Sequence, residues 1–414
     1  MRQTDLFPIT LPPAPTRQAG LERLKGFTPC MGRAYAARRN YDFGPQDRSN
    51  ISCLSAHVRH RLVLEAELAQ TALAAHGYQA AEKFIQEVCW RTYWKGWLEL
   101  RPSVWTDYTA ERDLAVSTLA QDQALRQRYD AAVEGRTGLD GFDAWAAELI
   151  ETGYLHNHAR MWFASIWIFT LQLPWVLGAD HFLRHLIDGD AASNTLSWRW
   201  VGGLQTVGKT YLARASNIKT YTEGRFSPDP ASLAPDAPPL PSRKPSPAPG
   251  LIQPGQRPDP ALPSVLVLHE EDLHAESWGL DNADIRAVIH PASPVARGNE
   301  ALGEASARFT QAALDDGADR AAERWSVKAV ACDSADEVLM AARDCGARQL
   351  ITQRPQQGPV HDRFAELADS CDAAGMPLVC LTRDWDQAFH PYATKGFFKF
   401  KGVIETVFNQ LGLR

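Results

Sequence analysis

A proline-rich segment divides this chain of 414 residues into two parts. Residues 228–263 contain thirteen prolines in thirty-six positions. Proline fixes φ and has no backbone N–H to donate, so this segment is excluded from helices and central strands and favours extended conformations. We therefore interpret residues 227–263 as a linker between two domains, residues 1–226 and residues 264–414.

The two domains show different hydrophobic patterns. In residues 1–226, apolar residues recur at helical spacing, as in Phe84, Ile85, Val88 and Cys89, which predicts an all-helical domain. In residues 264–414, short apolar runs alternate with amphipathic stretches, a pattern typical of a Rossmann-like, doubly wound parallel sheet. The expected strands are Ser264–Leu268, Ile285–Ile289, Val327–Ala331, Gln349–Thr352 and Pro377–Cys380, and two expected helices are Ser306–Trp325 and Asp336–Cys345.

Composition limits the possible locations and cofactors. No run of eighteen apolar residues occurs, and prolines interrupt residues 1–15, where a signal peptide would need an apolar core. The seven cysteines form no Cys-x-x-Cys pair and the histidines do not cluster at ligand spacing, so we expect no metal site. We expect a cytoplasmic, monomeric protein that does not associate with membranes.

Charge and tryptophan are unevenly distributed. The chain has 43 Lys and Arg residues and 49 Asp and Glu residues. Residues 1–226 contain 25 of the basic residues and 23 of the acidic residues, which gives a net charge of +2. The remainder of the chain therefore holds 18 and 26, a net charge of −8. Ten of the thirteen tryptophans lie between positions 90 and 200. A nucleic acid would thus meet the helical domain, which also has an unusual number of large flat rings.

The densest polar segments are residues 153–162 and 186–200. On a helix, Asn157, Arg160 and Met161 share one face, so an amide, a cation and a soft apolar group would converge there. Such a face could line a pocket. The alternative is that Arg160 pairs structurally with Asp188 and that the nearby tryptophans belong to the core.

Four blocks in residues 35–221 resemble, in order and spacing, the flavin-binding helical domain of the photolyase/cryptochrome family. A single Ser-x-Leu-Ser would mean nothing, but four ordered blocks are specific to the family. They are Tyr35-Ala-Ala-Arg-Arg-Asn40, Ser52-Cys-Leu-Ser55, Glu87-Val-Cys-Trp-Arg-Thr-Tyr-Trp94, and the two polar segments together with Gly135-Arg-Thr-Gly-Leu-Asp-Gly-Phe-Asp143.

The resemblance implies that FAD is the cofactor. It makes Ser52–Ser55 the diphosphate loop, where hydroxyls at a helix start can donate to phosphate. Ile51 stands where the family usually has threonine, and Arg48, Ser49 or Asn50 could compensate. Asn194 would face the reactive ring nitrogen, where an amide can either donate or accept. The resemblance also places Asp188 and Asp190 against the ring and adenine side, with Arg160 as the partner of Asp188. The residues implied for cofactor binding are Tyr35, Ser52, Cys53, Leu54, Ser55, Arg160, Asp188, Gly189, Asp190 and Asn194.

The resemblance also implies a site for damaged DNA. Aromatic walls can stack on bases, a carboxylate can bind a base edge, and photolyases extrude the damaged bases from the duplex. The residues implied to hold the lesion are Glu87, Trp90, Asn157, Met161 and Trp200, with Arg91 and His158 as DNA contacts. Family members that act on the (6-4) lesion have two histidines where this chain has Asn157 and Met161, so the cyclobutane dimer is favoured.

Two tryptophans match an electron-transfer chain. Trp198 and Trp175 correspond to the inner members of the family's chain. The outer member would fall between positions 106 and 132, which contain no tryptophan, so Trp105, Trp162 or Trp167 could end the chain instead. The alternative is that these rings are packing residues.

Residues 264–402 resemble the family's α/β antenna domain, which in ordinary photolyases precedes the helical domain. We therefore interpret the chain as a domain-permuted member of the family. The leading hypothesis is light-driven repair of cyclobutane pyrimidine dimers in DNA by electron transfer from reduced FAD. The alternative is a cryptochrome-like blue-light photoreceptor without repair activity, with an unknown signalling partner. A second antenna chromophore is possible, but its identity is unknown.

Overall fold

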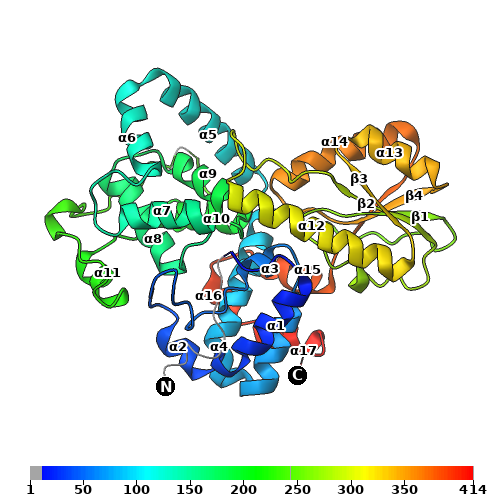
Figure 1. Ribbon diagram of the computed structural model, residues 1–414, viewed down its shortest axis with the longest axis horizontal. Coiled ribbons are helices and arrows are strands. Elements are labelled where there is room, and N and C mark those ends of the chain that lie inside the picture. The colour runs from blue at the N-terminus through cyan, green and yellow to red at the C-terminus, as the bar shows by residue number, and fades with distance from the viewer. Residues whose placement is uncertain (1–11, 243, 414) are drawn as a thin grey trace.

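The computed structural model describes residues 12–242 and 244–413. Most of the segment on which the signal-peptide expectation rests therefore lies outside the described residues. Figure 1 shows a helical part and a sheet side by side, with α12 (Glu304–Trp325) reaching from one to the other. The predicted fold class, a helical domain followed by an α/β domain, is confirmed.

Helices form the first part of the chain. The longest, α4, is broken at Gly77, whose φ of 67° is outside the helical region. A short π-helix, η3 (Ile166–Thr170), follows α8 directly. The helices are α1 (Arg17–Phe27), α2 (Arg33–Arg38), α3 (Ser55–Arg59), α4 (Glu65–Glu99), α5 (Ser103–Gln121), α6 (Gln123–Val133), α7 (Phe142–Thr152), α8 (Asn157–Ser165), α9 (Trp175–His185), α10 (Ala191–Val201) and α11 (Ala215–Tyr221).

The second part contains a parallel sheet with strand order β3-β2-β1-β4-β5. Alternate residues of β1 face opposite sides: Leu266 packs in the cluster with α12, whereas Val265 and Val267 pack in the cluster with α13 and α14. Both faces are thus covered. The strands are β1 (Ser264–Val267), β2 (Ile285–Pro291), β3 (Lys328–Cys332), β4 (Gln349–Gln353) and β5 (Leu378–Leu381), and the helices that follow β3 and β4 are α13 (Ala335–Asp344) and α14 (Pro359–Ala374).

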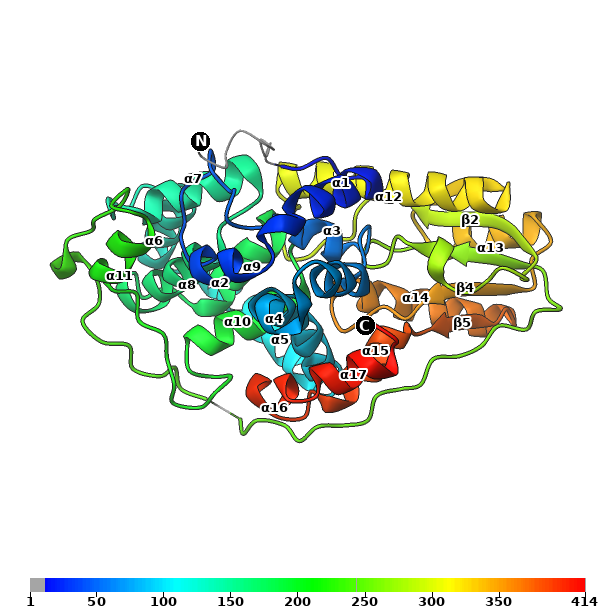
Figure 2. The same ribbon diagram turned by 90° about the horizontal axis from the view of Figure 1, so that it is seen from below.

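The last three helices pack on the helical part and not on the sheet (Figure 2). They are α15 (Asp384–Phe389), α16 (Phe397–Lys401) and α17 (Ile404–Gln410). Trp385 is buried there, and its indole N–H donates to the Thr92 hydroxyl of α4 at 2.9 Å. The chain therefore returns to α4 after the sheet is complete, although the sequence analysis grouped residues 264–414 together. The domain boundary itself stays a prediction.

The proline-rich segment runs over the outside of the molecule (Figure 2). The Gly250 N–H donates to the Leu100 carbonyl oxygen at 2.7 Å, and the Gln256 N–H to the Cys380 carbonyl oxygen at 2.9 Å. Its path thus touches both parts of the protein. None of the helices in the described residues is long and apolar enough to cross a membrane.

Buried histidines make stability depend on pH. His156 and His390 are 1% and 3% exposed. Burial lowers the pKa of His156 to about 3 and that of His390 to about 4, whereas an unfolded histidine titrates near pH 6.5. Between these values the unfolded state binds protons that the folded state does not. Stability is therefore complete above about pH 6.5 and falls as the pH decreases toward 4.

We expect each of these histidines to contribute at most about 1.4 kcal/mol per pH unit to this loss, and about 1 kcal/mol per pH unit on average between pH 7 and 5. Urea unfolding at pH 7, 6 and 5 measures the slope of the free energy of unfolding. The variant His390→Gln should have a slope smaller by about that amount. An unchanged slope would show that His390 is protonated in the folded protein or does not change state on unfolding.

Candidate functional site

The predicted diphosphate loop, Ser52–Ser55, leads into α3 and is held by Arg23. The Arg23 guanidinium donates to the carbonyl oxygens of Ser52 and Ile51 at 2.7 and 2.8 Å. Cys53 has a φ of 53°, a left-handed conformation that is rare outside glycine and that persists only where its surroundings enforce it. The loop thus has a fixed shape. Arg23 was missed in the sequence analysis, because nothing in its neighbourhood marks it.

Apolar contacts place other predicted residues around this loop. Tyr35 packs with Ile51, Cys53 and Tyr154 in one small cluster, so the structure brings Tyr35 and the loop together as predicted. Leu54 is buried in the main helical core and anchors the other side of the loop. Burial raises the pKa of Tyr35, so its phenol stays protonated.

Two residues that could compensate for Ile51 are already engaged elsewhere. The Arg48 guanidinium forms buried ion pairs with Asp42 and Glu148. The Asn50 amide donates to two backbone carbonyl oxygens, both at 2.8 Å. These partners orient both side chains within the protein, so neither supplies the hydroxyl that threonine would have provided.

The turn between α9 and α10 carries the first predicted carboxylate. Arg160 Nη2 donates to Asp188 Oδ2 at 2.8 Å. Asp188 Oδ1 is buried and has no hydrogen-bond partner of acceptable geometry among the described residues. Burial by itself raises the pKa of Asp188, but Arg160 and a hydrogen bond from the Ser55 side chain outweigh it and hold the pKa below its usual value. The predicted pair therefore exists, and it presents one unused, ionised oxygen.

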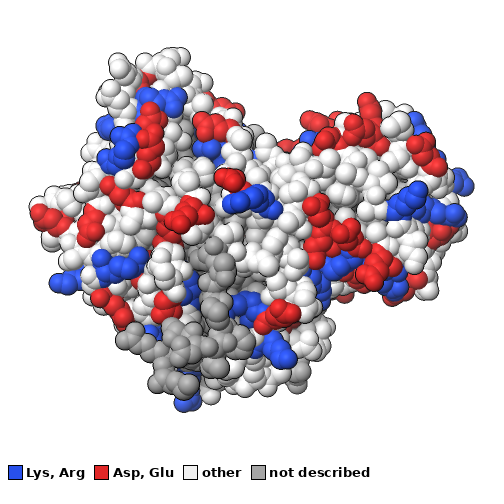
Figure 3. Space-filling model, in the orientation of Figure 1, with Lys and Arg blue, Asp and Glu red and all other residues white. Residues whose placement is uncertain are grey.

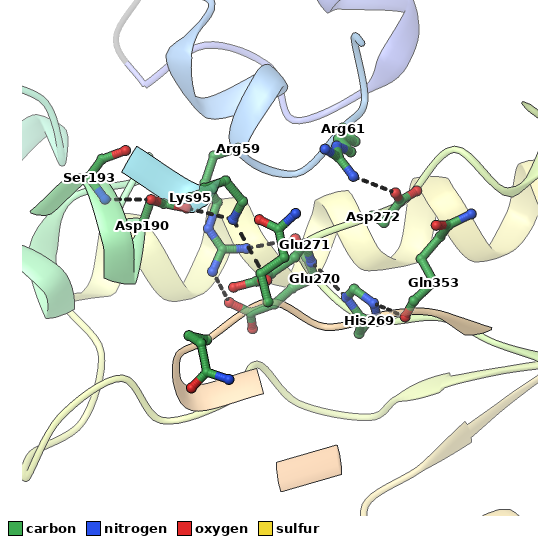
Figure 4. Close-up of polar contacts among 12 residues, drawn as sticks. Arg59, Arg61, Lys95, Asp190, Ser193, His269, Glu270, Glu271, Asp272 and Gln353 are labelled. Carbon is green, nitrogen blue, oxygen red and sulfur yellow. Dashed lines mark hydrogen bonds and ion pairs between the residues drawn. The ribbon is translucent and has the colours of Figure 1, made fainter. Parts of the chain in front are cut away.

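The second predicted carboxylate, Asp190, begins α10 and accepts from the Ser193 N–H at 2.7 Å. Lys95 Nζ lies 2.9 Å and Arg91 Nη2 3.2 Å from Asp190 Oδ2 (Figure 4 shows the Lys95 contact). Burial opposes ionisation, but these two cations keep the pKa of Asp190 far below its usual value. Arg91, predicted to contact DNA, thus points inward to Asp190. Lys95 was not identified, since nearly one hundred residues separate it from Asp190.

Gly189 and Asn194 lie next to these two carboxylates, Gly189 between them in the turn and Asn194 in the first turn of α10. A Cβ atom at position 189 would lie 2.7 Å from the Leu183 carbonyl oxygen and 2.9 Å from that of Leu186, so only glycine fits. The Asn194 amide donates to the Ala179 carbonyl oxygen at 2.7 Å. This bond fixes the side-chain orientation and uses one of the two N–H groups of the amide, which leaves the amide oxygen able to accept from a donor.

These residues fit the chemistry of FAD. The flavin ring offers an N–H donor, and Asp188 Oδ1 is a buried acceptor that has no hydrogen bond of acceptable geometry among the described residues. The hydroxyl of Ser52 lies in the loop before α3, and Ser55, the first residue of α3, hydrogen-bonds Asp188 and so brings this loop next to the carboxylate. The described residues contain no group of three or more His, Cys, Asp or Glu that could hold a metal ion.

Glu87 and Trp90 lie one turn apart on α4. The Glu87 side chain is 37% exposed, and one of its oxygens is 3.5 Å from Arg39 Nε. Desolvation by the surrounding protein raises the pKa of Glu87, while Arg39 opposes this effect. Trp90 is partly buried and stacks on Phe397 of α16, with ring centroids 3.6 Å apart and planes 11° from parallel. The sequence did not predict that the last helices would support this ring.

The remaining predicted lesion residues lie on α8 and α10. Asn157, the first residue of α8, is exposed, and Met161 is partly buried one turn later. Trp200 is partly buried and stacks against Tyr211, with ring centroids 5.6 Å apart. Their role in holding a lesion stays a prediction.

His158 is packed within the protein. One ring nitrogen lies 3.0 Å from the Asn40 carbonyl oxygen, the other lies 3.3 Å from the Tyr211 hydroxyl, and the ring stacks on Trp162 at 4.1 Å. Burial lowers the pKa of His158, so the ring is neutral at pH 7. A DNA contact by His158 stays a prediction, and it would add no positive charge.

Trp198 lies among other rings in the core. Its ring centroid is 6.2 Å from that of Trp167, and Trp167 in turn lies 5.8 Å from Tyr129. A Cβ atom at Gly178 would lie 2.3 Å from Trp198 and 2.9 Å from Trp167, so glycine allows α9 to approach both indoles. Trp175 instead contacts Tyr108 at 5.7 Å. Among the three alternatives for an outer tryptophan, Trp167 is the one whose ring contacts Trp198.

Comparison with known proteins identifies the type of domain that these residues form. Residues 84–229 match the family model described as the FAD binding domain of DNA photolyase. These residues therefore form a domain of the FAD-binding photolyase type, for which FAD is the cofactor.

Curated relatives agree with this assignment. The deoxyribodipyrimidine photo-lyase of Streptomyces griseus is 35% identical over 170 residues, which cover 40% of this chain and 36% of the relative. An enzyme of the same name from Thermus thermophilus is 34% identical over 196 residues, covering 46% and 44%. The chain therefore spans less than half the length of these two relatives.

Solved structures give a weaker likeness. A class III photolyase from Agrobacterium tumefaciens aligns with a TM-score of 0.42 at 22% identity, covering 50% of this chain and 43% of that one. A cryptochrome from Synechocystis aligns with a TM-score of 0.41 at 22% identity over the same shares. At such scores the likeness adds nothing to what the sequence relatives show.

Proposed function

We propose that this protein is a light-driven DNA-repair enzyme that splits cyclobutane pyrimidine dimers. The observation that carries the proposal is the buried Asp188–Arg160 pair with its unused oxygen, located in a domain of the FAD-binding photolyase type. The two relatives compared above are deoxyribodipyrimidine photo-lyases. Reduced FAD, when bound and excited by light, would supply the electron that splits the dimer.

The protein's own residues would bind and orient the reactants. Asp188 would accept a hydrogen bond from the flavin ring, and Asn194 would present its amide oxygen to it. Glu87 would bind a base edge through its carboxyl oxygens. Trp90 and Trp200 would stack on the extruded bases.

Charge favours the helical part as the DNA-binding side. Figure 3 shows acidic and basic side chains interspersed over the visible face, with acidic groups over α12. That helix carries five acidic residues, Glu304, Asp315, Asp316, Asp319 and Glu323. DNA binding by this protein is thus expected to be modest and to weaken as salt increases. A signalling partner, a second chromophore, a cytoplasmic location and a monomeric state stay predictions.

The test is light-dependent loss of dimers from an ultraviolet-damaged oligonucleotide incubated with the reduced protein. We expect loss in blue or near-ultraviolet light and none in the dark. If the protein binds FAD and its flavin is reduced by light, yet dimers remain in every condition, the photoreceptor hypothesis should replace repair.

Replacing Trp198 by phenylalanine should separate two light reactions. We expect Trp198→Phe to slow light-driven reduction of oxidised flavin several-fold or more, because that process needs electrons from outside. Repair by chemically reduced protein should be unchanged, because the electron returns to the flavin. The two rates are measured by flavin absorption and by dimer loss, with Trp167→Phe and Trp175→Phe to trace the next ring. Equal loss of both activities would show that Trp198 is structural.

A further inference from the structure

We infer that the carboxyl edge of the parallel sheet supports the flavin site, with Glu270 as the central positioning residue, an inference that rests on the proposed function. In open α/β sheets, ligands usually bind at this edge, where the strand order reverses. The strand order β3-β2-β1-β4-β5 puts that point between β1 and β4. In this protein, Glu270, Glu271 and Asp272, which follow β1 after Leu268 and His269, form ion pairs with residues of the helical part instead (Figure 4).

Glu270 joins two arginines in a fully buried cluster. Its Oε1 atom lies 2.6 Å from Arg59 Nη2 and 3.0 Å from Arg297 Nη2. The three side chains are between 1% and 3% exposed. Its Oε2 atom accepts from the Val295 N–H at 3.0 Å. Every oxygen of this carboxylate therefore has a partner, as a buried charge requires.

Both arginines hold the turn that carries the predicted flavin carboxylates. Arg59 Nε donates to the Gly189 carbonyl oxygen at 3.0 Å. Arg297 Nη1 donates to the Leu186 carbonyl oxygen at 3.2 Å. Glu270, a residue of the sheet part, thus fixes the two arginines whose side chains hold residues 186–189. Arg59 also ends α3, the helix that begins at the diphosphate loop, so the same contact orients both predicted flavin segments.

A second contact reaches the same turn. Lys95 Nζ lies 2.9 Å from Asp190 Oδ2 and 3.9 Å from Glu271 Oε2 (Figure 4). Lys95 is therefore placed between a carboxylate of the predicted flavin site and a carboxylate of the sheet edge. Glu270 therefore acts on the turn through Arg59 and Arg297, and Glu271 acts on it through Lys95.

The charge of Glu270 is essential to this arrangement. Burial and the neighbouring Arg59 both disfavour the Arg297 cation and lower its pKa to about 10, while Glu270 opposes them. Without the carboxylate, two buried guanidinium groups would repel each other with no anion between them. Their separation would release the carbonyl oxygens of Leu186 and Gly189, and the turn would lose its fixed shape.

The experiment compares Glu270→Gln with Asp272→Asn in the full-length protein. Asp272 is a matched control: it is 1% exposed, and its ion-pair partners, Arg61 and Arg383, lie outside the turn. FAD affinity is measured by titrating folded apoprotein, and the visible circular dichroism of bound flavin reports its orientation. Thermal unfolding of the apoprotein is followed in parallel. We expect Glu270→Gln to weaken FAD binding at least tenfold and change the dichroism, and Asp272→Asn to change FAD affinity less than threefold.

A milder variant keeps the inference falsifiable if Glu270→Gln does not fold. Ser306 Oγ accepts from Arg297 Nη1 at 3.1 Å and donates to the Leu186 carbonyl oxygen at 3.3 Å. Ser306→Ala should weaken FAD binding two- to fivefold without a change in the melting temperature of the apoprotein that exceeds that of Asp272→Asn. If the natural protein binds FAD and these variants bind it equally well, or if Asp272→Asn loses as much affinity as they do, the inference is wrong. A natural protein that never binds FAD would overturn the proposed function, and this inference with it.

Discussion

Replacing Asp188 and Arg160 together by alanine should abolish retention of FAD. The change removes a buried anion that has one unused oxygen, and the cation that holds the other oxygen at 2.8 Å. Hydrogen bonds to charged groups are worth about 1.5 to 3 kcal/mol each, so losing one of them weakens binding by roughly tenfold to more than a hundredfold, and losing two weakens it by at least about a hundredfold. The double change also avoids leaving one unpaired charge in the protein. Flavin released on denaturation of the purified protein measures the effect.

A second buried pair serves as the control for this variant. Asp180 and Arg184 are separated by 2.8 Å and lie on α9, in the same part of the protein. Their side chains are 7% and 6% exposed, similar to that of Asp188. We expect Asp180→Ala with Arg184→Ala to lower the melting temperature and to keep FAD. Normal flavin content in the Asp188 and Arg160 variant, or equal loss in the control, would contradict the assigned site.

Local patterns were sufficient to predict most of the secondary structure. The amphipathic stretch Ser306–Trp325 corresponds to α12, and the apolar run Gln349–Thr352 corresponds to β4 within one residue. These elements follow from hydrophobic periodicity, which is a property of neighbouring residues. The docking of α15 to α17 on α4 could not be predicted, because it depends on contacts such as Trp385 with Thr92, almost three hundred residues apart.

The candidate site, too, could be predicted only in part from the sequence. The Asp188–Arg160 contact and the proximity of Tyr35 to the loop were predicted from the family resemblance and are present. The residues that hold these groups, such as Arg23 and Lys95, belong to no motif. Glu270 and Glu271 follow the first strand in a segment that carries no recognised motif. Supporting contacts of this kind are set by tertiary packing, and any nearby cation or anion of suitable length can make them.

Replacing Trp90 by alanine should lower affinity for dimer-containing DNA by roughly tenfold or more. Stacking of a base on an aromatic ring is worth about 1 to 3 kcal/mol, and 1.4 kcal/mol corresponds to a tenfold change. Phe397 lies parallel to Trp90 at 3.6 Å and fixes the plane of the indole. We therefore expect Phe397→Ala to weaken binding by a smaller factor, because the ring is kept but its orientation is less restricted. Both affinities are measured on one oligonucleotide, with and without a dimer, at a fixed salt concentration.

Trp94 provides a matched control for Trp90. It lies one turn further along α4, is also partly buried and contacts Trp90 at 5.3 Å, and it has no predicted contact with a lesion. Trp94→Ala should leave the preference for damaged over undamaged DNA within about threefold of the natural protein, because stacking on Trp90 is preserved. Binding to undamaged DNA should change little in any of these variants, since it depends on phosphate contacts. If the natural protein does not prefer damaged DNA and Trp90→Ala changes nothing, the ring is a packing residue and the repair hypothesis fails.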